Sequence, residues 1–403
     1  MTVRFGNIFK GDRIIWGLIV VFLVYSLLAV YSSSVSVAFA SHGGNTGYFL
    51  KWQILMIFAS LIIILIVHHL PTKVFFQLAG FFVLVSIVLL ILTLIIGVRV
   101  NEAARSLIIP GTDFRIQTSD VAKVSLVIYL ARMLSRQLHD LNDFKLTTRV
   151  FIVPIGIICA LILPQNLSTA LLIFGICMII LFIGRVPLKF IFAWIGIGLA
   201  AVILFAIILD ATTDTNRVST WKARIENFVS GEDDGDGDYQ ANQAKIAIAT
   251  GGLIGKAPGN SVQRNMLPQS NSDFIFAIII EEYGLLFGAL PLLFLYLILL
   301  FRGIAIARKC ETAFPAFLVL GLTIMIVVQA IVNMAVAVGL IPVTGQTLPM
   351  ISWGRISMGI TSISLGAILG VSRVVNAKAR QEIIEEEDEV AEQDEVIYEG
   401  ATT

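Results

Sequence analysis

The sequence is short of charge. Only 14% of its 403 residues are Asp, Glu, Lys or Arg, while 57% are hydrophobic. Soluble domains carry about a quarter charged residues, and here the apolar residues also come in long uninterrupted blocks. The lack of charge therefore excludes a soluble globular protein and predicts an all-α integral membrane protein.

Cysteine is also scarce. The three cysteines, Cys159, Cys177 and Cys310, lie in or beside apolar blocks. Their spacing fits neither a metal site nor a disulfide framework. We expect these side chains to fill the apolar interior.

Basic residues are missing from the C-terminal end. After Arg380 the chain holds ten acids and no base, and the remainder has 28 bases against 18 acids. Such an acidic segment predicts a disordered, solvated tail over 379–403. The predicted organisation is therefore a tail over 1–13, a membrane domain over 14–378 and this acidic tail.

The apolar blocks predict about ten transmembrane helices, since crossing the hydrocarbon takes about 20 mostly apolar residues. The fourth span is interrupted by Asp120, Lys123 and Arg132, and the fifth is separated from the sixth by the break at 164–166. The ten predicted spans are 14–36, 52–69, 74–98, 118–136, 149–163, 167–184, 188–209, 273–301, 313–339 and 349–372.

The distribution of Lys and Arg predicts the orientation. Both tails and the short loops on one side of the predicted spans carry bases. By the positive-inside rule, this side is cytoplasmic and both termini lie inside. The long loop between spans 7 and 8, about 210–272, is then extracytoplasmic.

Polar residues concentrate in the predicted outer segments. Charges at membrane depth usually face a protein interior or a wet cavity, and Arg is the preferred partner of phosphate. We therefore expect a site for an anionic substrate there. Its candidate ligands are Arg105, Asp120, Lys123, Lys256, Gln263, Arg264, Thr344, Gln346 and Ser352.

The glycine-rich stretch GGLIGKA in the long loop is not a nucleotide site. Only three residues separate Gly251 from Gly255, and Ala257 replaces the Ser or Thr that would hold magnesium in a P-loop.

The eighth predicted span carries three carboxylates. If 273–301 is one helix, Glu281 lies about 12 Å deeper than Asp273, and Glu282 faces the opposite side. The three therefore cannot act at one point. Asp273 is a candidate catalytic residue at the outer surface or, alternatively, a helix-capping acid. Glu281 and Glu282 are predicted to be structural, each pairing to hold the spans together.

Several blocks resemble the SEDS family (shape, elongation, division, sporulation), in the family's order and over nearly the whole chain. They match the division (FtsW) branch more than the elongation (RodA) branch. The blocks are AARSLIIPGTDFRIQTSDVAK, PQNLST, YQANQAKIAIATGGLIGKAPGNSVQ, LPQSNSDFIFAIIIEEYG and PVTGQTLPMISWGRIS.

The resemblance implies a peptidoglycan glycosyltransferase that polymerises lipid II at the outer face of a bacterial cytoplasmic membrane, during septal wall synthesis. The implied partners are a class B penicillin-binding protein, other division proteins and membrane lipids, with no nucleic acid. The family's essential aspartate falls on Asp273, and its conserved arginine, acid and lysine fall on Arg105, Asp120 and Lys123. A divalent cation, Mg²⁺ or Mn²⁺, is compatible with the diphosphate, but no ligand cluster requires one and no metal site is predicted.

The chain departs from the family's pattern in three places. It has Gln117-Thr118-Ser119-Asp120 where Gln-Pro-Ser-Glu is usual, Asn166 in place of an acid, and Arg355 where a second glycine is common.

The expected mechanism makes Asp273 the general base on the acceptor 4-hydroxyl. Arg105, Lys123 and Arg264 are then candidates to stabilise the departing diphosphate. Two other functions stay open at this point. A transporter of lipid-linked precursor would use the intramembrane charges as coupling groups, and a division scaffold would act through its tails.

Overall fold

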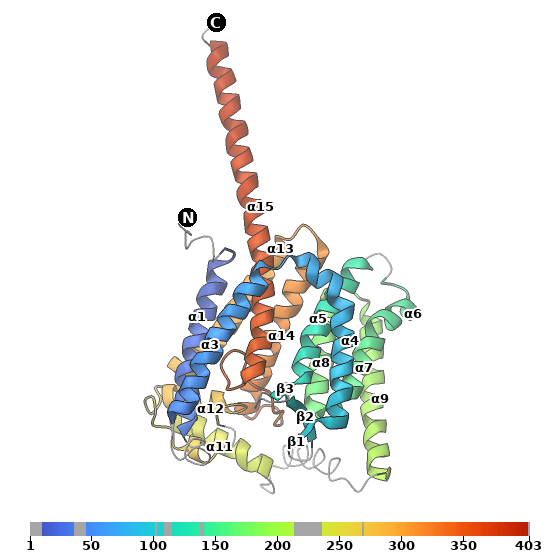
Figure 1. Ribbon diagram of the computed structural model, residues 1–403, viewed down its shortest axis with the longest axis vertical. Coiled ribbons are helices and arrows are strands. Elements are labelled where there is room, and N and C mark those ends of the chain that lie inside the picture. Colours follow the sequence, from blue (N-terminus) through green and yellow to red (C-terminus); the bar gives the residue numbers. More distant parts are fainter. Residues whose placement is uncertain are drawn as a thin grey trace.

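The computed structural model describes residues 10–35, 46–100, 103–108, 115–137, 141–212, 236–267 and 270–401. Most of these residues are helical (Figure 1). The long helices in the first half of the chain are α1 (Arg13–Ser33), α3 (Thr46–His69), α4 (Thr72–Ile96), α5 (Thr118–Arg136), α7 (Val153–Ile162), α8 (Leu167–Ile183) and α9 (Leu188–Thr212). Those in the second half are α11 (Asp236–Gly251), α12 (Ile275–Gly284), α13 (Leu290–Arg308), α14 (Ala313–Ala337) and α15 (Arg355–Ala401). The short elements are α6 (Phe144–Thr147), the π-helical turns η2 (Thr148–Ile152) and η4 (Leu285–Ala289), and the 3-10 turn η3 (Gln263–Asn265).

Helices occupy the positions of all the predicted spans. Eight helical segments of the described chain are long and apolar enough to cross a membrane. The apolar helix α8 has 17 residues, and α5, with 19 residues, carries the charges that interrupt the fourth span. The all-helical membrane class is confirmed, and the count of ten spans stays a prediction.

Side chains cap the first turns of α1 and α8, which satisfies backbone N–H groups that an apolar surrounding would leave unpaired. Asp12 caps α1, because its Oδ1 accepts hydrogen bonds from Ile14 N at 2.9 Å and Ile15 N at 3.2 Å. Asn166 caps α8 in the same way, accepting from Thr169 N at 3.2 Å. The break at 164–166 is therefore the end of one helix and the capped start of the next.

Helix α14 lies at the centre of the bundle, where it packs against α5, α8, α13 and α15. Most of its residues are buried, whereas α9 lies at the edge of the bundle, where it contacts α8 and the short elements α6 and η2 (Figure 1). Side chains of α14 are therefore the ones best placed to reach several spans at once.

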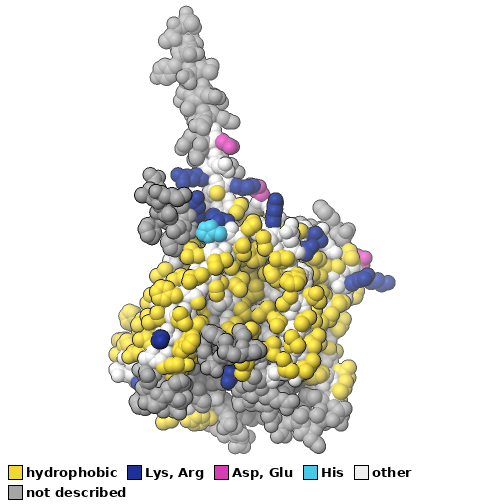
Figure 2. Space-filling view, viewed as in Figure 1, with side chains coloured by type: hydrophobic (Ala, Val, Ile, Leu, Met, Phe, Trp, Pro, Cys, Tyr) yellow, Lys and Arg dark blue, Asp and Glu magenta, His cyan; other side chains and the backbone are white. Residues whose placement is uncertain are grey.

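The bundle has two distinct ends. Helix α1 begins, and α15 leaves, at one end, here called the inner end; the opposite, outer end carries the short sheet with α11 and α12 (Figure 1). Figure 2 shows a broad apolar band with most of the visible Lys and Arg side chains gathered beyond it at the inner end. That distribution agrees with the predicted cytoplasmic location of this end.

A three-stranded sheet at the outer end was not predicted. Strands β1 (Val98–Val100), β2 (Ala103–Ile108) and β3 (Arg115–Gln117) pair antiparallel in the order β1-β2-β3. The sheet packs against α4, α5 and α15. Segments of three to six residues between two strongly apolar helices give too short a pattern for a strand prediction.

The predicted single helix over 273–301 is wrong. The chain turns at Gly284, whose φ is 74°, so that α12 and α13 have different directions. Asn333, one turn before the end of α14, contacts Asp273, and Ser32, at the end of α1, contacts Glu282. Helix α12 therefore runs across the outer end from α14 to α1, so Asp273 and Glu281 are separated laterally and not by depth.

The glycine-rich stretch 251–256 fills the break between α12 and α13. A side chain at Gly251, Gly255 or Gly284 would collide with the facing backbone, so the two segments touch through their main chains. The backbone groups freed by the turn are paired across this contact: Lys256 N donates to Glu281 O at 2.9 Å, Leu285 N to Gly252 O at 3.0 Å and Leu286 N to Leu253 O at 3.0 Å.

The expected disordered tail is replaced by helix, because α15 continues as one helix to Ala401. The segment after Gly370 is rich in Ala, Glu, Gln, Lys and Arg, and neither Gly nor Pro interrupts it before Gly400. Those residue types have high helix propensity, so local propensity outweighs the charge that predicted disorder.

Candidate functional site

The turn that carries Asp273 is held by its main-chain carbonyls. Asp273 is half-buried and lies just before Phe274, which occupies the N-cap position of α12. Three successive carbonyl oxygens of the turn accept hydrogen bonds from α14 or from the residues before α15: Asn271 O from Trp353 N at 2.8 Å, Ser272 O from Ser352 Oγ at 2.6 Å and Asp273 O from Asn333 Nδ2 at 2.8 Å. The backbone at Asp273 is therefore fixed to two of the last spans.

The segment 342–348 is tied to the same place. Asn333 Nδ2 also donates to Gln346 O at 2.7 Å, and Gln346 Nε2 donates to Thr169 Oγ1, at the start of α8, at 2.7 Å. Ser352 Oγ accepts from Leu348 N at 2.8 Å. Gln346 and Ser352, both predicted as substrate ligands, are buried here and hold the main chain around Asp273.

Asp120 and Lys123 form a buried ion pair on α5. Their side chains are 6% and 4% exposed, and Lys123 Nζ lies 2.8 Å from Asp120 Oδ1. Lys123 Nζ also donates to Gln329 Oε1 at 2.7 Å, and Gln329 Nε2 donates to Thr347 O at 3.0 Å. The structure therefore gives this predicted pair protein partners inside the bundle, next to the segment that supports Asp273.

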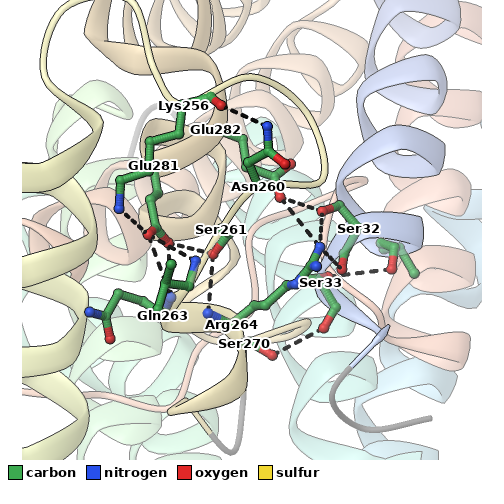
Figure 3. A network of polar contacts seen from close by, with 12 residues as sticks. Ser32, Ser33, Lys256, Asn260, Ser261, Gln263, Arg264, Ser270, Glu281 and Glu282 are labelled. Atoms are coloured by element: carbon green, nitrogen blue, oxygen red, sulfur yellow. Dashed lines mark hydrogen bonds and ion pairs between the residues drawn. The ribbon is translucent and has the colours of Figure 1, made fainter. Parts of the chain in front are cut away.

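Glu281 is the anchor of the loop that precedes α12 (Figure 3). Its side chain is fully buried and accepts hydrogen bonds from two side chains and two backbone groups. The donors are Lys256 Nζ at 2.8 Å, Ser261 Oγ, Val262 N at 3.1 Å and Gln263 N at 3.2 Å. One carboxylate therefore binds both ends of the segment 256–263.

Glu282 ties the same loop to α1 (Figure 3). Its Oε1 accepts a hydrogen bond from Ser32 Oγ and lies 3.9 Å from Arg264 Nη1. Arg264 Nη1 also donates to Ser32 O at 3.3 Å. Both glutamates are buried, and their contacts are those expected of structural residues.

The predicted site residues thus separate into two groups at opposite ends of α12. Asp120, Lys123, Gln346 and Ser352 connect to the Asp273 turn, whereas Lys256, Gln263 and Arg264 surround Glu281 and Glu282. Lys256 and Arg264, proposed for an anionic substrate, are already paired with carboxylates in this structure.

Arg105 and Thr344 are the two remaining predicted ligands. Arg105 lies on β2, and its side chain is outside the described part of the structure. Thr344 is half-buried in the segment 342–348, and its Oγ1 has no hydrogen-bond partner among the described residues.

Sequence reasoning missed Asn333 and Gln329. Both lie in the predicted span 313–339, which is otherwise strongly apolar and was treated as an ordinary span. A signal was present, because two carboxamides four residues apart share one helix face, and polar groups inside a span usually face protein.

The described residues contain no group of three or more His, Cys, Asp or Glu side chains that could hold a metal ion. The donor set around Asp273 is mainly amide and hydroxyl rather than carboxylate.

Comparison with known proteins gives a consistent result. Residues 12–377 match the family model described as cell cycle protein, FtsW/RodA/SpoVE. A probable peptidoglycan glycosyltransferase FtsW of Marinomonas mediterranea is 34% identical, covering 95% of this chain and 92% of that protein. Stage V sporulation protein E of Bacillus subtilis is 32% identical, covering 87% and 94%.

Solved structures agree in fold. A chain from a study of the structural coordination of polymerization and crosslinking by a peptidoglycan synthase complex has a TM-score of 0.68 at 24% identity, covering 91% of this chain and 98% of that one. The rod shape determining protein RodA of Thermus thermophilus has a TM-score of 0.64 at 23% identity, with the same coverage.

Proposed function

Since the chain belongs to the FtsW/RodA/SpoVE family of cell cycle proteins, we propose that it is a peptidoglycan glycosyltransferase with Asp273 as its general base. It is a multi-pass membrane protein. Its substrate is lipid II, which it polymerises into glycan strands at the outer face of the cytoplasmic membrane during septal wall synthesis. Its relatives of the FtsW name support the division role.

The observation that carries the proposal is the anchored turn at the outer end. A sugar hydroxyl is a poor nucleophile at neutral pH, and a carboxylate in a fixed position can take its proton as it attacks. Asp273 lies on a turn whose three carbonyls are held by α14 and by residues 352–353. A precursor with a lipid tail stays in the membrane, so its sugar headgroup can reach a carboxylate at the outer end of the bundle.

The reaction balances without a further reagent. The 4-hydroxyl oxygen of the acceptor sugar bonds to the anomeric carbon of the donor, and its proton passes to the Asp273 carboxylate. The bond from that carbon to the lipid diphosphate breaks, and the diphosphate leaves with the electron pair. Cationic groups stabilise the charge that develops on it. Arg105 is the leading candidate, because Lys123, Lys256 and Arg264 have carboxylate partners.

The partner that we propose is a class B penicillin-binding protein, a transpeptidase that crosslinks the strands, together with other division proteins. The structural match to a chain from a peptidoglycan synthase complex supports such an assembly.

The test is polymerisation of lipid II by the purified chain with its cognate transpeptidase. Asp273→Asn is expected to lower the rate at least about 100-fold, the usual contribution of a general base. Glu311→Gln is the matched control, because Glu311 is 58% exposed and, among the described residues, forms its ion pair with Lys378 at the inner end. Moenomycin is expected to leave the parent reaction unaffected.

Normal glycan synthesis by Asp273→Asn would refute the catalytic assignment. Lipid translocation by the reconstituted protein that does not depend on Asp273 would instead favour a transporter.

A further inference from the structure

Asn333 is buried near the outer end of α14 and uses both amide hydrogens. Its side chain is 1% exposed, and Nδ2 donates to Asp273 O at 2.8 Å and to Gln346 O at 2.7 Å. Both acceptors are carbonyl oxygens, so the reverse orientation of the carboxamide would place Oδ1 against two acceptors. The contacts therefore fix the orientation of this side chain as well as its partners.

One of these contacts falls on the peptide of Asp273 itself. The other two carbonyls of the turn are held by Trp353 N and Ser352 Oγ, from the residues just before α15. Asn333 supplies the only one of the three contacts that comes from α14. It joins the aspartate turn to the segment 342–348, which Gln346 in turn fastens to α8.

Asn333 has a companion one turn earlier on the same face of α14. Gln329 donates to Thr347 O at 3.0 Å and accepts from Lys123 at 2.7 Å. The segment 342–348 is therefore hydrogen-bonded to α14 at two successive residues, and this pair of contacts fixes its orientation relative to the helix. Asn333 therefore links the Asp273 peptide to a segment that α14 holds by two hydrogen bonds.

We propose that Asn333 is a positioning residue for Asp273, an inference that rests on the proposed function. By holding the Asp273 carbonyl, Asn333 sets the direction in which the side chain leaves the main chain. A base displaced by about 1 Å loses about 100-fold in rate. Asn333 itself touches no substrate; it acts through the geometry of the residue that takes the proton.

The test compares polymerisation kinetics of three Asn333 variants in the full complex. Asn333→Leu keeps the branched outline of the side chain and removes both donors, Asn333→Ala removes most of the side chain, and Asn333→Ser keeps one donor. We expect Asn333→Leu and Asn333→Ala to lower kcat about 10- to 100-fold with KM for lipid II changed less than about 3-fold. Asn333→Ser should restore part of the loss.

Thr323→Val is the matched control on the same helix. Thr323 is 1% exposed, and its Oγ1 has no hydrogen-bond partner among the described residues. The substitution keeps the shape and leaves the Asp273 turn untouched, so kcat should stay at the parent value. A thermal melt of each variant separates folding from catalysis, and Asn333→Leu keeps the test valid if Asn333→Ala fails to fold.

The outcomes distinguish a failure of the glycosyltransferase function from a failure of the positioning role of Asn333. If the parent complex makes no glycan, or Asp273→Asn is fully active, the proposed function fails and the positioning role fails with it. If both behave as expected but Asn333→Leu works at the parent kcat, only the positioning role is overturned. A rise in KM at unchanged kcat, or an equal loss of kcat in Thr323→Val, overturns it as well.

Discussion

Glu281 offers the sharpest test of the loop architecture, because its contacts are with backbone and hydroxyl groups as much as with a cation. The perturbation is Glu281→Ala. It removes the acceptor for Ser261 Oγ, Val262 N and Gln263 N and leaves Lys256 without its carboxylate. Lys256→Ala is the comparison, since it removes the cation and its hydrogen bond to Thr250 but leaves the other three donors to Glu281 in place.

The two variants should differ in how much free energy each removes from the contacts that hold the segment 256–263. A hydrogen bond to a charged acceptor contributes about 1.5–3 kcal/mol, and breaking a buried charged contact costs about 3–5 kcal/mol in total. The Lys256 side chain is 30% exposed, so its charge is partly hydrated and its loss costs about 1 kcal/mol or less. Glu281→Ala should therefore release the segment 256–263 while Lys256→Ala leaves it docked.

Amide hydrogen exchange of the purified protein measures this directly. At about 1.4 kcal/mol per factor of ten, the amides of Val262 and Gln263 should exchange about 10²- to 10³-fold faster in Glu281→Ala. In Lys256→Ala the acceleration should stay below about tenfold. The helical amides of α14 serve as the internal reference, because they do not contact the loop's carboxylate anchor.

Equal acceleration in the two variants would refute the reasoning, since the ion pair alone would then hold the loop. Unchanged exchange in Glu281→Ala would show that the loop is fixed by other contacts.

Three further predictions concern stability and reactivity. Gly284→Ala should lower the free energy of unfolding by more than about 3 kcal/mol or prevent folding, because φ is 74° and the new Cβ would overlap a loop carbonyl. Gly252→Ala, at φ 56° with open space around it, should lower the free energy of unfolding by only about 1 kcal/mol. Thermal unfolding of the two variants measures the difference. Asp12→Ala should lower the free energy of unfolding by about 2 kcal/mol, because it removes the α1 cap and the ion pair with Arg302, whose side chain is 37% exposed. Asp12→Ser should recover the cap's share of about 1 kcal/mol in the same melt. Burial raises the pKa of the Cys310 thiol to about 11, so maleimide labelling followed by mass spectrometry should stay slow up to about pH 10 in folded protein and become fast after denaturation; fast labelling at pH 7.5 would contradict the burial.

The sequence predicts the parts of this fold that depend on long apolar runs and on single polar residues within them. Each predicted span falls on helical residues, although the span 273–301 divides into α12 and α13. Charges inside a span are expected to face protein or a wet cavity, and the structure buries Asp120 and Lys123 as an ion pair. The pairing of Glu281 and Glu282 with basic residues was also derivable, because a charge inside a span needs a partner.

The crossing helix α12 could not be predicted in the same way. Its apolar residues run on into α13 without a change of composition, so the pattern is that of one long span. The turn depends on the positive φ of Gly284 and on main-chain contacts from the segment 251–256, which leave no periodic signal. Asn333 was missed for a related reason, since its role depends on carbonyl groups 13 and 60 residues away.

The projecting part of α15 has a mechanical consequence. From Arg373 to Ala401 the helix is about 42 Å long at 1.5 Å per residue, and its distal portion after Arg380 bears ten negative charges without a compensating positive one. Anionic lipid headgroups repel such a rod, so it cannot lie flat along a bilayer and stands away from it. A molecule that binds the C-terminal end of α15 is therefore held about 40 Å from the lipid surface.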